Sequence, residues 1–200
     1  MNKIIPIIIF ALLFGFGVYV YVFNEYGTQE ENEHPTEEEP SPFVLLQNTM
    51  ITAPGTDVSV RLVNGVGSYE IVPGSASQGV VRVLDDVFAI RKEGDRTDMA
   101  VILVSDSGGS GVFYYLALFN VVGGEVQKTS ESFLGDRIVV EGIGVGELVH
   151  GPDAEYRLSV RTFVRKKAEP MASEPTVSNI RTFYVTNQVL EEVEVGKDDT

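Results

Sequence analysis

The chain has 200 residues, which is room for one domain of ordinary size and an appendage, and its formal net charge is −14 at pH 7. It contains no cysteine, so thiol catalysis, thiolate zinc sites and iron–sulfur clusters are excluded. The acidic balance argues against a nucleic-acid partner, because nucleic-acid phosphates require a basic protein surface.

The first predicted element is a membrane-spanning helix. Residues 4–23 read IIPIIIFALLFGFGVYVYVF and carry no charge, and about 20 apolar residues in a helix match the hydrocarbon core of a bilayer. Lys3 precedes this segment and the next Lys or Arg is Arg61, so the positive-inside rule places the N-terminus in the cytoplasm. We predict that residues 1–23 are a signal anchor, that residues 4–23 bind the cytoplasmic membrane, and that this is a single-pass bacterial protein.

The alternative interpretation of this segment is a cleaved signal peptide, which would make the protein secreted. Gly15 and Gly17 resemble the small residues of a cleavage site. The apolar run continues past both glycines and is longer than an ordinary signal-peptide core, which favours the uncleaved anchor.

Residues 24–42 are predicted to be a disordered linker. They contain seven Glu and no Lys or Arg. A segment this acidic and poor in apolar residues cannot bury enough surface to offset its chain entropy, so we expect a solvated tether.

Residues 43–195 are predicted to form an extracytoplasmic all-β domain, followed by a disordered tail over residues 196–200. No stretch from Phe43 onward has clear helical periodicity, and short β-branched and aromatic runs alternate with Gly, Asn and Pro. About ten such runs suit an antiparallel sandwich or a curled sheet. The strand-like runs are 43–51, 58–63, 67–72, 79–92, 99–105, 112–122, 125–134, 137–145, 156–166, 180–186 and 189–195.

Local patterns refine this prediction. Asn64-Gly65 is a strong hairpin-turn signal, and the final two strands are expected to turn at Asn187-Gln188. Residues 79–92 are expected to form one long or bent strand, with a short helix as the alternative. Residues 156–166 alternate apolar and polar side chains, which predicts one wet face.

The stretch SDSGGSG (residues 105–111) resembles a phosphate-binding glycine loop at first sight. Such a loop needs a helix after it and often a Lys after the last Gly. Here Val112, Phe113, Tyr114 and Tyr115 follow, which favour a strand. We therefore predict a turn between two strands.

A hydrolytic triad would have to be built on His150. Its partners would be Ser107 or Ser110 as the nucleophile and Asp106 or Asp153 behind the histidine. No G-x-S-x-G elbow precedes a helix, so His150 is interpreted as a loop residue. We predict no catalytic residue and no cofactor.

The stretch EGDRTD offers weak calcium-ligand candidates in Asp95 and Asp98, with Glu93 beside them. It lacks the spacing of an EF-hand loop, and Arg96 interrupts the acids. A polar hairpin connection is therefore favoured, and no metal site is predicted.

The densest basic patch contains Arg161, Arg165, Lys166 and Lys167. It is interpreted either as a surface for an anionic polymer or lipid head groups, or as a solvated strand end. The loop EPMASEP follows, and we expect its Met171 to plug one end of the core.

Several strings resemble a group of uncharacterised bacterial envelope domains, which occur in predicted lipoproteins and sometimes beside META-type domains. These strings are GSYEIVPGSAS, DMAVILVSDSGGSGVFYYLAL, LGDRIVVEGI and EPMASEP, and the similarity covers about residues 68–193. It implies an extracytoplasmic β-rich domain of unknown activity and supplies no catalytic residue. Lipoprotein relatives attach through a cysteine, whereas this chain would attach through its own helix. The motif residues are Gly108, Gly109, Gly111, Phe113, Tyr115, Asp136, Pro170, Met171 and Pro175.

Together these features predict a non-enzymatic interaction or structural module of the bacterial cell envelope, with an envelope protein or polymer as partner. An exposed aromatic patch that includes Tyr114 or Tyr115 would support this function. The alternatives are a cell-envelope hydrolase and a calcium-stabilised binding domain.

Overall fold

The computed structural model describes residues 39–74, 76–109, 111–146 and 155–193. The predicted anchor, the tail and nearly all of the acidic linker lie outside these residues. Among the described residues, no helix is long and apolar enough to cross a membrane. The described part is all-β apart from one short helix, which confirms the predicted fold class at this level.

The elements follow one another with short connections. In chain order they are α2 (Pro42–Gln47), β1 (Met50–Thr52), β2 (Ser59–Arg61), β3 (Val66–Glu70), β4 (Gln78–Glu93), β5 (Arg96–Asp106), β6 (Val112–Val122), β7 (Glu125–Asp136), β8 (Val139–Gly146), β9 (Tyr156–Val164), β10 (Val177–Thr186) and β11 (Val189–Val193).

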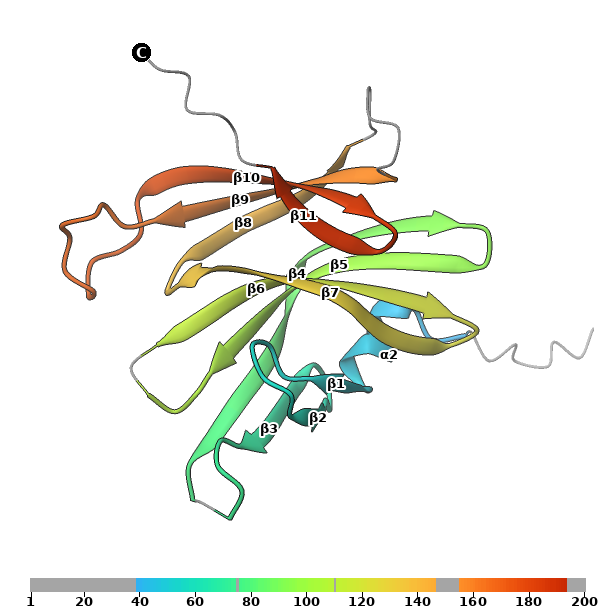
Figure 1. The fold of residues 1–200 in the computed structure, drawn as a ribbon, viewed down its shortest axis with the longest axis horizontal. Coiled ribbons are helices and arrows are strands. Elements are labelled where there is room, and N and C mark those ends of the chain that lie inside the picture. Colours follow the sequence, from blue (N-terminus) through green and yellow to red (C-terminus); the bar gives the residue numbers. More distant parts are fainter. Residues whose placement is uncertain (1–38, 75, 110, 147–154, 194–200) are drawn as a thin grey trace, which may run out of the picture. The chain divides into compact units, whose positions relative to one another are not determined.

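These strands form three antiparallel sheets (Figure 1). The first sheet contains β3 to β7 and the second contains β8 to β11, while β1 and β2 pair in a small third sheet. Within the two larger sheets the spatial order of the strands follows the chain order. Both are therefore meanders, in which each strand pairs with the strands before and after it.

The first sheet lies between two other layers, and the burial of its central strand β5 shows that both of its faces are covered. In β5 every residue from Thr97 to Ser105 is buried, so both faces of the strand are covered. The run Met99–Val104 supplies apolar side chains to both faces, as expected for a strand with a core on each side.

Two hydrophobic cores lie on the two faces of the first sheet. On one face, Met99, Val101 and Leu103 pack with residues of α2, β1 and β2, including the fully buried Leu46. On the other face, Ala100 and Ile102 pack with residues of the second sheet. The two larger sheets thus pack face to face, and the helix with the small sheet covers the opposite side.

The predicted hairpin turns are confirmed. Asn64 and Gly65 have φ values of 51° and 78°, and Val63 and Val66 bridge across the turn. Asn187 and Gln188 have φ values of 48° and 64°. Positive φ at both central residues is the geometry that matches the twist of two hairpin strands.

The expected strand over residues 43–51 is wrong in its first half. Ser41 caps a helix there by accepting a hydrogen bond from the N–H of Val44 at 3.4 Å, and Pro42 occupies the first helical turn. Proline suits that position because its missing N–H would have no helical partner. The helix begins one residue inside the expected linker, and only Met50–Thr52 remains as strand.

The prediction of one long strand near residues 79–92 is confirmed, and the alternative of a short helix is wrong. β4 spans Gln78–Glu93, with an irregularity in its pairing to β5 between Val83 and Phe88. β3 pairs with the first part of β4, whereas β5 pairs with both parts.

Polar contacts join the two larger sheets where β7 lies beside β11. The backbone N–H of Leu190 donates to Ser130 Oγ at 3.0 Å, and Asn120 Nδ2 donates to Gln188 Oε1 at 3.1 Å. Arg181 of β10 also donates to the backbone oxygen of Phe133 at 2.6 Å. These bonds tie the two sheets together along one side.

Candidate functional site

The glycine-rich stretch is a turn, as predicted. β5 ends at Asp106 and β6 begins at Val112, with no helix after the glycines. Asp106 Oδ1 accepts the N–H of Gly108 at 2.9 Å, so this carboxylate is engaged in the turn. Gly108 has φ 70°, and a Cβ there would lie 2.9 Å from the backbone oxygen of Gln78.

Asp136 fastens the other end of this turn to β7. Its Oδ1 accepts the N–H of Val112 at 2.9 Å, and the N–H of Arg137 donates to the backbone oxygen of Val112 at 2.7 Å. Gly111 leaves room for the ring of Phe113, which a Cβ would approach to 2.4 Å. In this structure Gly108, Gly111 and Asp136 therefore shape the turn.

The aromatic residues of the motif join one that sequence reasoning did not single out. Phe133 of β7 lies 5.4 Å from Tyr115 and 6.2 Å from Phe113 between ring centroids. Phe133 is 48% exposed, whereas Tyr115 packs against the first core. Burial, and secondarily Glu131, raises the pKa of the Tyr115 hydroxyl. The exposed member of this group is Phe133, and Tyr114 packs against the second core.

The hydrolase hypothesis depends on residues that the structure does not place. His150, Asp153 and Ser110 lie outside the described residues. Of the remaining candidates, Asp106 is engaged with the turn backbone.

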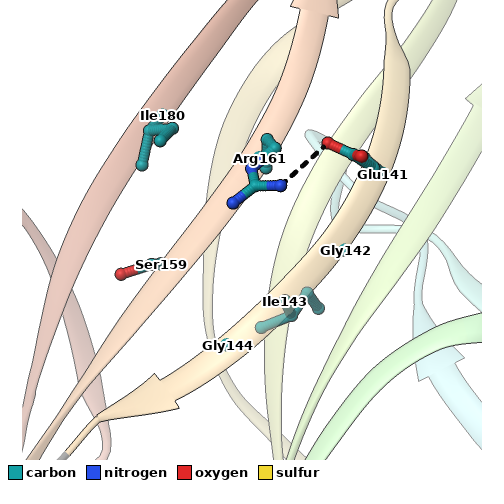
Figure 2. Close-up of a pocket in the computed structure, with 7 residues that line it drawn as sticks. All are labelled: Glu141, Gly142, Ile143, Gly144, Ser159, Arg161 and Ile180. Carbon is teal, nitrogen blue, oxygen red and sulfur yellow. Dashed lines mark hydrogen bonds and ion pairs between the residues drawn. The ribbon is translucent and has the colours of Figure 1, made fainter.

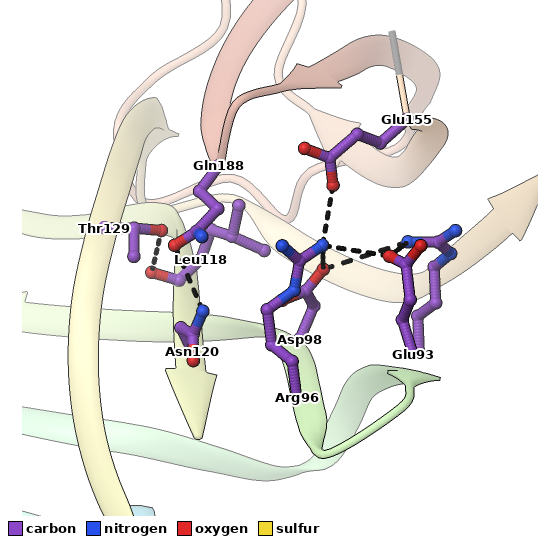
Figure 3. A network of polar contacts seen from close by, with 9 residues as sticks. Glu93, Arg96, Asp98, Leu118, Asn120, Thr129, Glu155 and Gln188 are labelled. Carbon is purple, nitrogen blue, oxygen red and sulfur yellow. Dashed lines mark hydrogen bonds and ion pairs between the residues drawn. The ribbon is translucent and has the colours of Figure 1, made fainter. Parts of the chain in front are cut away.

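A cluster of charged side chains lies at one end of the two packed sheets, and we call it the Arg96 cluster (Figure 3). Arg96 Nε lies 3.1 Å from Asp98 Oδ1, and Arg96 Nη2 lies 2.8 Å from Glu155 Oε2. Arg91 and Glu93 complete the cluster with an ion pair of 2.9 Å. Since Glu155 leads into β9, the cluster joins the β4–β5 hairpin to the second sheet.

The cluster is a closed electrostatic arrangement. The Asp98 side chain is 3% exposed, and burial raises the pKa of its carboxyl while the Arg96 guanidinium opposes that shift. Arg91 lies 4.8 Å above the ring of Tyr156, whose hydroxyl pKa burial raises well above its usual range. Each arginine of the cluster forms an ion pair with a carboxylate of the cluster. The two guanidiniums are therefore already engaged within the protein.

Of the weak calcium candidates, Asp98 has its carboxylate engaged with Arg96 and Arg91 in this structure. Asp95 lies in the exposed turn between β4 and β5. Across the described residues, no group of three side chains suitable for holding a metal ion is present.

The outer face of the second sheet carries an open groove of about 580 Å³ (Figure 2). The register places Gly142 opposite Arg161 and Gly144 opposite Ser159, and β10 adds Ile180 beside Arg161. A bulge at Glu141 sets this register, because Val140 pairs with Thr162 while Gly142 pairs with Arg161. The groove is lined by Glu141, Gly142, Ile143, Gly144, Ser159, Arg161 and Ile180.

The glycines of the groove are explained neither by backbone conformation nor by packing. Gly142 and Gly144 lack the positive φ that favours glycine. A Cβ at Gly142 would meet no atom within 4 Å, and one at Gly144 would meet only the Ser159 oxygen at 4.0 Å. Glycine in a strand interior costs about 0.5–1 kcal/mol relative to alanine. What these two glycines provide is an open strand surface.

The charged pair of the groove and Ile180 face solvent, whereas Ile143 packs against the second core. Arg161 Nη1 and Glu141 Oε2 lie 3.4 Å apart, and their side chains are 57% and 47% exposed. An exposed pair at this separation holds its partners weakly. Ile180 is 55% exposed beside them, so the groove offers charged and aliphatic contacts together.

A second arginine lies further along β9, beyond the residues that line the groove. Arg157 pairs with Gly146 in the register of β8 and β9, and a Cβ at Gly146 would lie 3.2 Å from Arg157 Nη2. The guanidinium therefore lies across a third glycine of β8. Within the described part of the chain, Arg157 forms no ion pair.

The basic patch predicted from sequence is divided by the fold. Arg165 Nε donates to the backbone oxygen of Ser173 at 2.6 Å, so it holds the loop between β9 and β10. Lys166 and Lys167 are exposed after the end of β9, while Arg161 belongs to the groove.

The predicted plug role of Met171 is wrong. Met171 is 55% exposed, because the loop that carries it turns outward from β9. Pro170 accepts a hydrogen bond from the N–H of Ser173 at 2.9 Å, and Pro175 lies just before β10. The two prolines thus belong to an ordered connection rather than to a seal of the core.

A scan against protein-family models and searches of curated proteins and solved structures gave no match. The resemblance to bacterial envelope domains therefore stays a prediction.

Proposed function

We propose that this chain is a membrane-anchored, extracytoplasmic β domain of the bacterial cell envelope, and that it acts as a non-enzymatic binding module. The uncharged segment over residues 4–23 and the position of Lys3 support the anchor and its orientation. The ligand site in this proposal is the groove on the outer face of the second sheet.

The observation that carries the proposal is the pair of unexplained glycines in β8. Gly142 and Gly144 weaken the strand without relieving any backbone strain or steric contact. Glycine inside a strand often marks a place where a ligand approaches closely. By contrast, the charged side chains of the Arg96 cluster already form ion pairs with one another.

Filling the groove tests the proposal. Gly144→Val should leave the fold intact, because its side chain enters open space and valine favours strands. A photo-crosslinking amino acid at Ile180 should give a specific adduct in intact cells, and Gly144→Val should reduce that adduct at least about tenfold by occupying the site.

Gly109→Val is the matched control, because it also enters open space but lies in the turn between β5 and β6. It should leave the adduct unchanged. An adduct that survives Gly144→Val in a chain with unchanged circular dichroism would show that the groove is not the binding site.

A further inference from the structure

We infer that the ligand of the groove is an anionic glycan-type polymer, a chain of hydroxylated units that carry phosphate or carboxylate groups. This inference rests on the proposed function and names the ligand class for the same site. It is carried by the arginine positions, the bare glycine strip beside them and the location of the groove on a sheet face.

The two arginines form a spaced pair of anion sites. Arg157, Ser159 and Arg161 alternate with buried residues along β9, so all three lie on the outer face. Four residues of antiparallel strand span about 13–14 Å. Arg157 has no ion pair among the described residues, and the single partner of Arg161 is the exposed Glu141 at 3.4 Å. Both guanidiniums are free to bind oxyanions through two parallel hydrogen bonds.

Glycines alternate along the second half of β8 beside this pair. Gly142, Gly144 and Gly146 stand opposite Arg161, Ser159 and Arg157 in register. A chain lying along β8 would therefore meet bare backbone on one side and alternating guanidinium and hydroxyl groups on the other. Ile180 offers an apolar contact for carbon atoms between the charged groups.

The place of the groove favours a glycan-type polymer over an acidic peptide. The groove lies over β8, β9 and β10, and the backbone groups of β9 are already paired with both neighbours. β8 is the edge strand of the second sheet, so a peptide could exchange main-chain hydrogen bonds with it, but that peptide would lie beside β8 and not over Arg157, Ser159 and Arg161. A hydroxylated polymer is recognised through side chains alone, and Ser159 supplies a hydroxyl for it.

The net charge of the β domain disfavours non-specific binding of a polyanion. Residues 43–200 contain 22 acidic and 14 basic residues, a net charge of −8, so the domain as a whole repels a polyanion. Removing one arginine should therefore have a large effect, whereas a polybasic surface would tolerate it.

The test is titration of the full chain in a neutral detergent with four probes: poly(glycerol phosphate), polygalacturonate, neutral dextran and poly-L-glutamate. At least one of the first two should bind, dextran should not, and poly-L-glutamate should bind more weakly. Arg157→Ala and Arg161→Ala should each weaken binding about tenfold, as expected for loss of a charge-assisted hydrogen bond. Arg61→Ala is the matched control, since Arg61 is exposed on β2 and should leave affinity unchanged.

Glu141→Gln sharpens the test, because it removes the acid that competes for Arg161. It should tighten binding roughly threefold and is expected to leave the fold unaffected, since Glu141 is exposed. Weaker binding of the polyanion after Glu141→Gln, or unchanged binding after Arg161→Ala, would show that Arg161 does not bind the anionic groups and would overturn the inference. Tighter binding to poly-L-glutamate than to either glycan-type probe would identify an acidic protein segment and also overturn it.

The failure of this inference is distinguishable from failure of the proposed function. If Gly144→Val abolishes the cellular adduct while neither polyanion binds the full chain, the groove is a binding site for another class of ligand. If the adduct survives Gly144→Val, the proposed function fails as well.

Discussion

Asp98 is a carboxyl group held in the interior beside Arg96 and Arg91. Burial raises its pKa above the ordinary value of 3.8, with Arg96 opposing the shift and Glu155 adding to it. The folded protein therefore holds this proton more tightly than the unfolded chain does. As the pH rises from about 3.8 through the folded pKa, the contribution of Asp98 to the free energy of unfolding falls.

Asp98→Asn removes this dependence, because an amide does not titrate in this range. The free energy of unfolding of the wild type should rise relative to that of Asp98→Asn as the pH is lowered from about 7 to about 4. Urea unfolding across this range measures the difference. Asp95→Asn is the control, since it makes the same substitution at an exposed position in the adjacent turn. If the free energies of unfolding of wild type and Asp98→Asn change in parallel with pH, the raised pKa of Asp98 is contradicted.

The turn between β5 and β6 shows how two neighbouring glycines differ in their structural role. Gly108 has φ 70° and a Cβ there would lie 2.9 Å from the backbone oxygen of Gln78, whereas a Cβ at Gly109 would meet no atom within 4 Å. Gly108→Ala should lower the free energy of unfolding by about 1–2 kcal/mol, because alanine is strained at positive φ and a Cβ would meet backbone.

The same substitution at Gly109 should change the free energy of unfolding by less than about 0.5 kcal/mol. Both variants are compared by urea unfolding at neutral pH. Equal losses at the two positions would show that general flexibility of the loop, rather than the conformation of Gly108, determines its stability.

Elements set by local signals are predictable from the sequence, and the rest depend on distant pairing. The turns at Asn64-Gly65 and Asn187-Gln188 follow from residues that adopt positive φ. The helix over Pro42–Gln47 has fewer than two turns, so no helical period develops in its six residues. Its signal was the Ser-Pro pair before an apolar run, which is typical of a helix start.

The candidate site was not predictable to the same degree. The alternating glycines Gly142, Gly144 and Gly146 can be recognised in the sequence. The side chains of β9 that lie beside them in the folded protein cannot. The bulge at Glu141 and the pairing with β9 decide which side chains stand beside them. The Arg96 cluster also depends on tertiary structure, because Arg96 and Glu155 are 59 residues apart in the chain.

At the scale of the whole molecule, the predicted orientation makes the β domain accessible from outside the cell. Protease added to intact spheroplasts should cut within residues 24–42 and release the β domain, since the acidic composition of this segment predicts a linker that proteases can cleave. Immunoblotting of the released and membrane fractions measures this, with a cytoplasmic protein as the intact control. Protection of the domain would contradict the orientation, and its absence from untreated membranes would indicate a cleaved signal peptide.

The meander order of both sheets determines how the domain can assemble. Each strand of the two larger sheets pairs with its neighbours in the chain. The sheets can therefore fold one hairpin at a time during synthesis, beginning at the N-terminal end. The last strand of the first sheet ends at Asp136, so this sheet is synthesised before β8 to β11. Until those last strands arrive, the apolar face around Ile102 and Leu116 is uncovered. A chain that ends after residue 136 would therefore expose this apolar face to solvent. We expect such a chain to aggregate, and to be bound by chaperones or degraded by proteases.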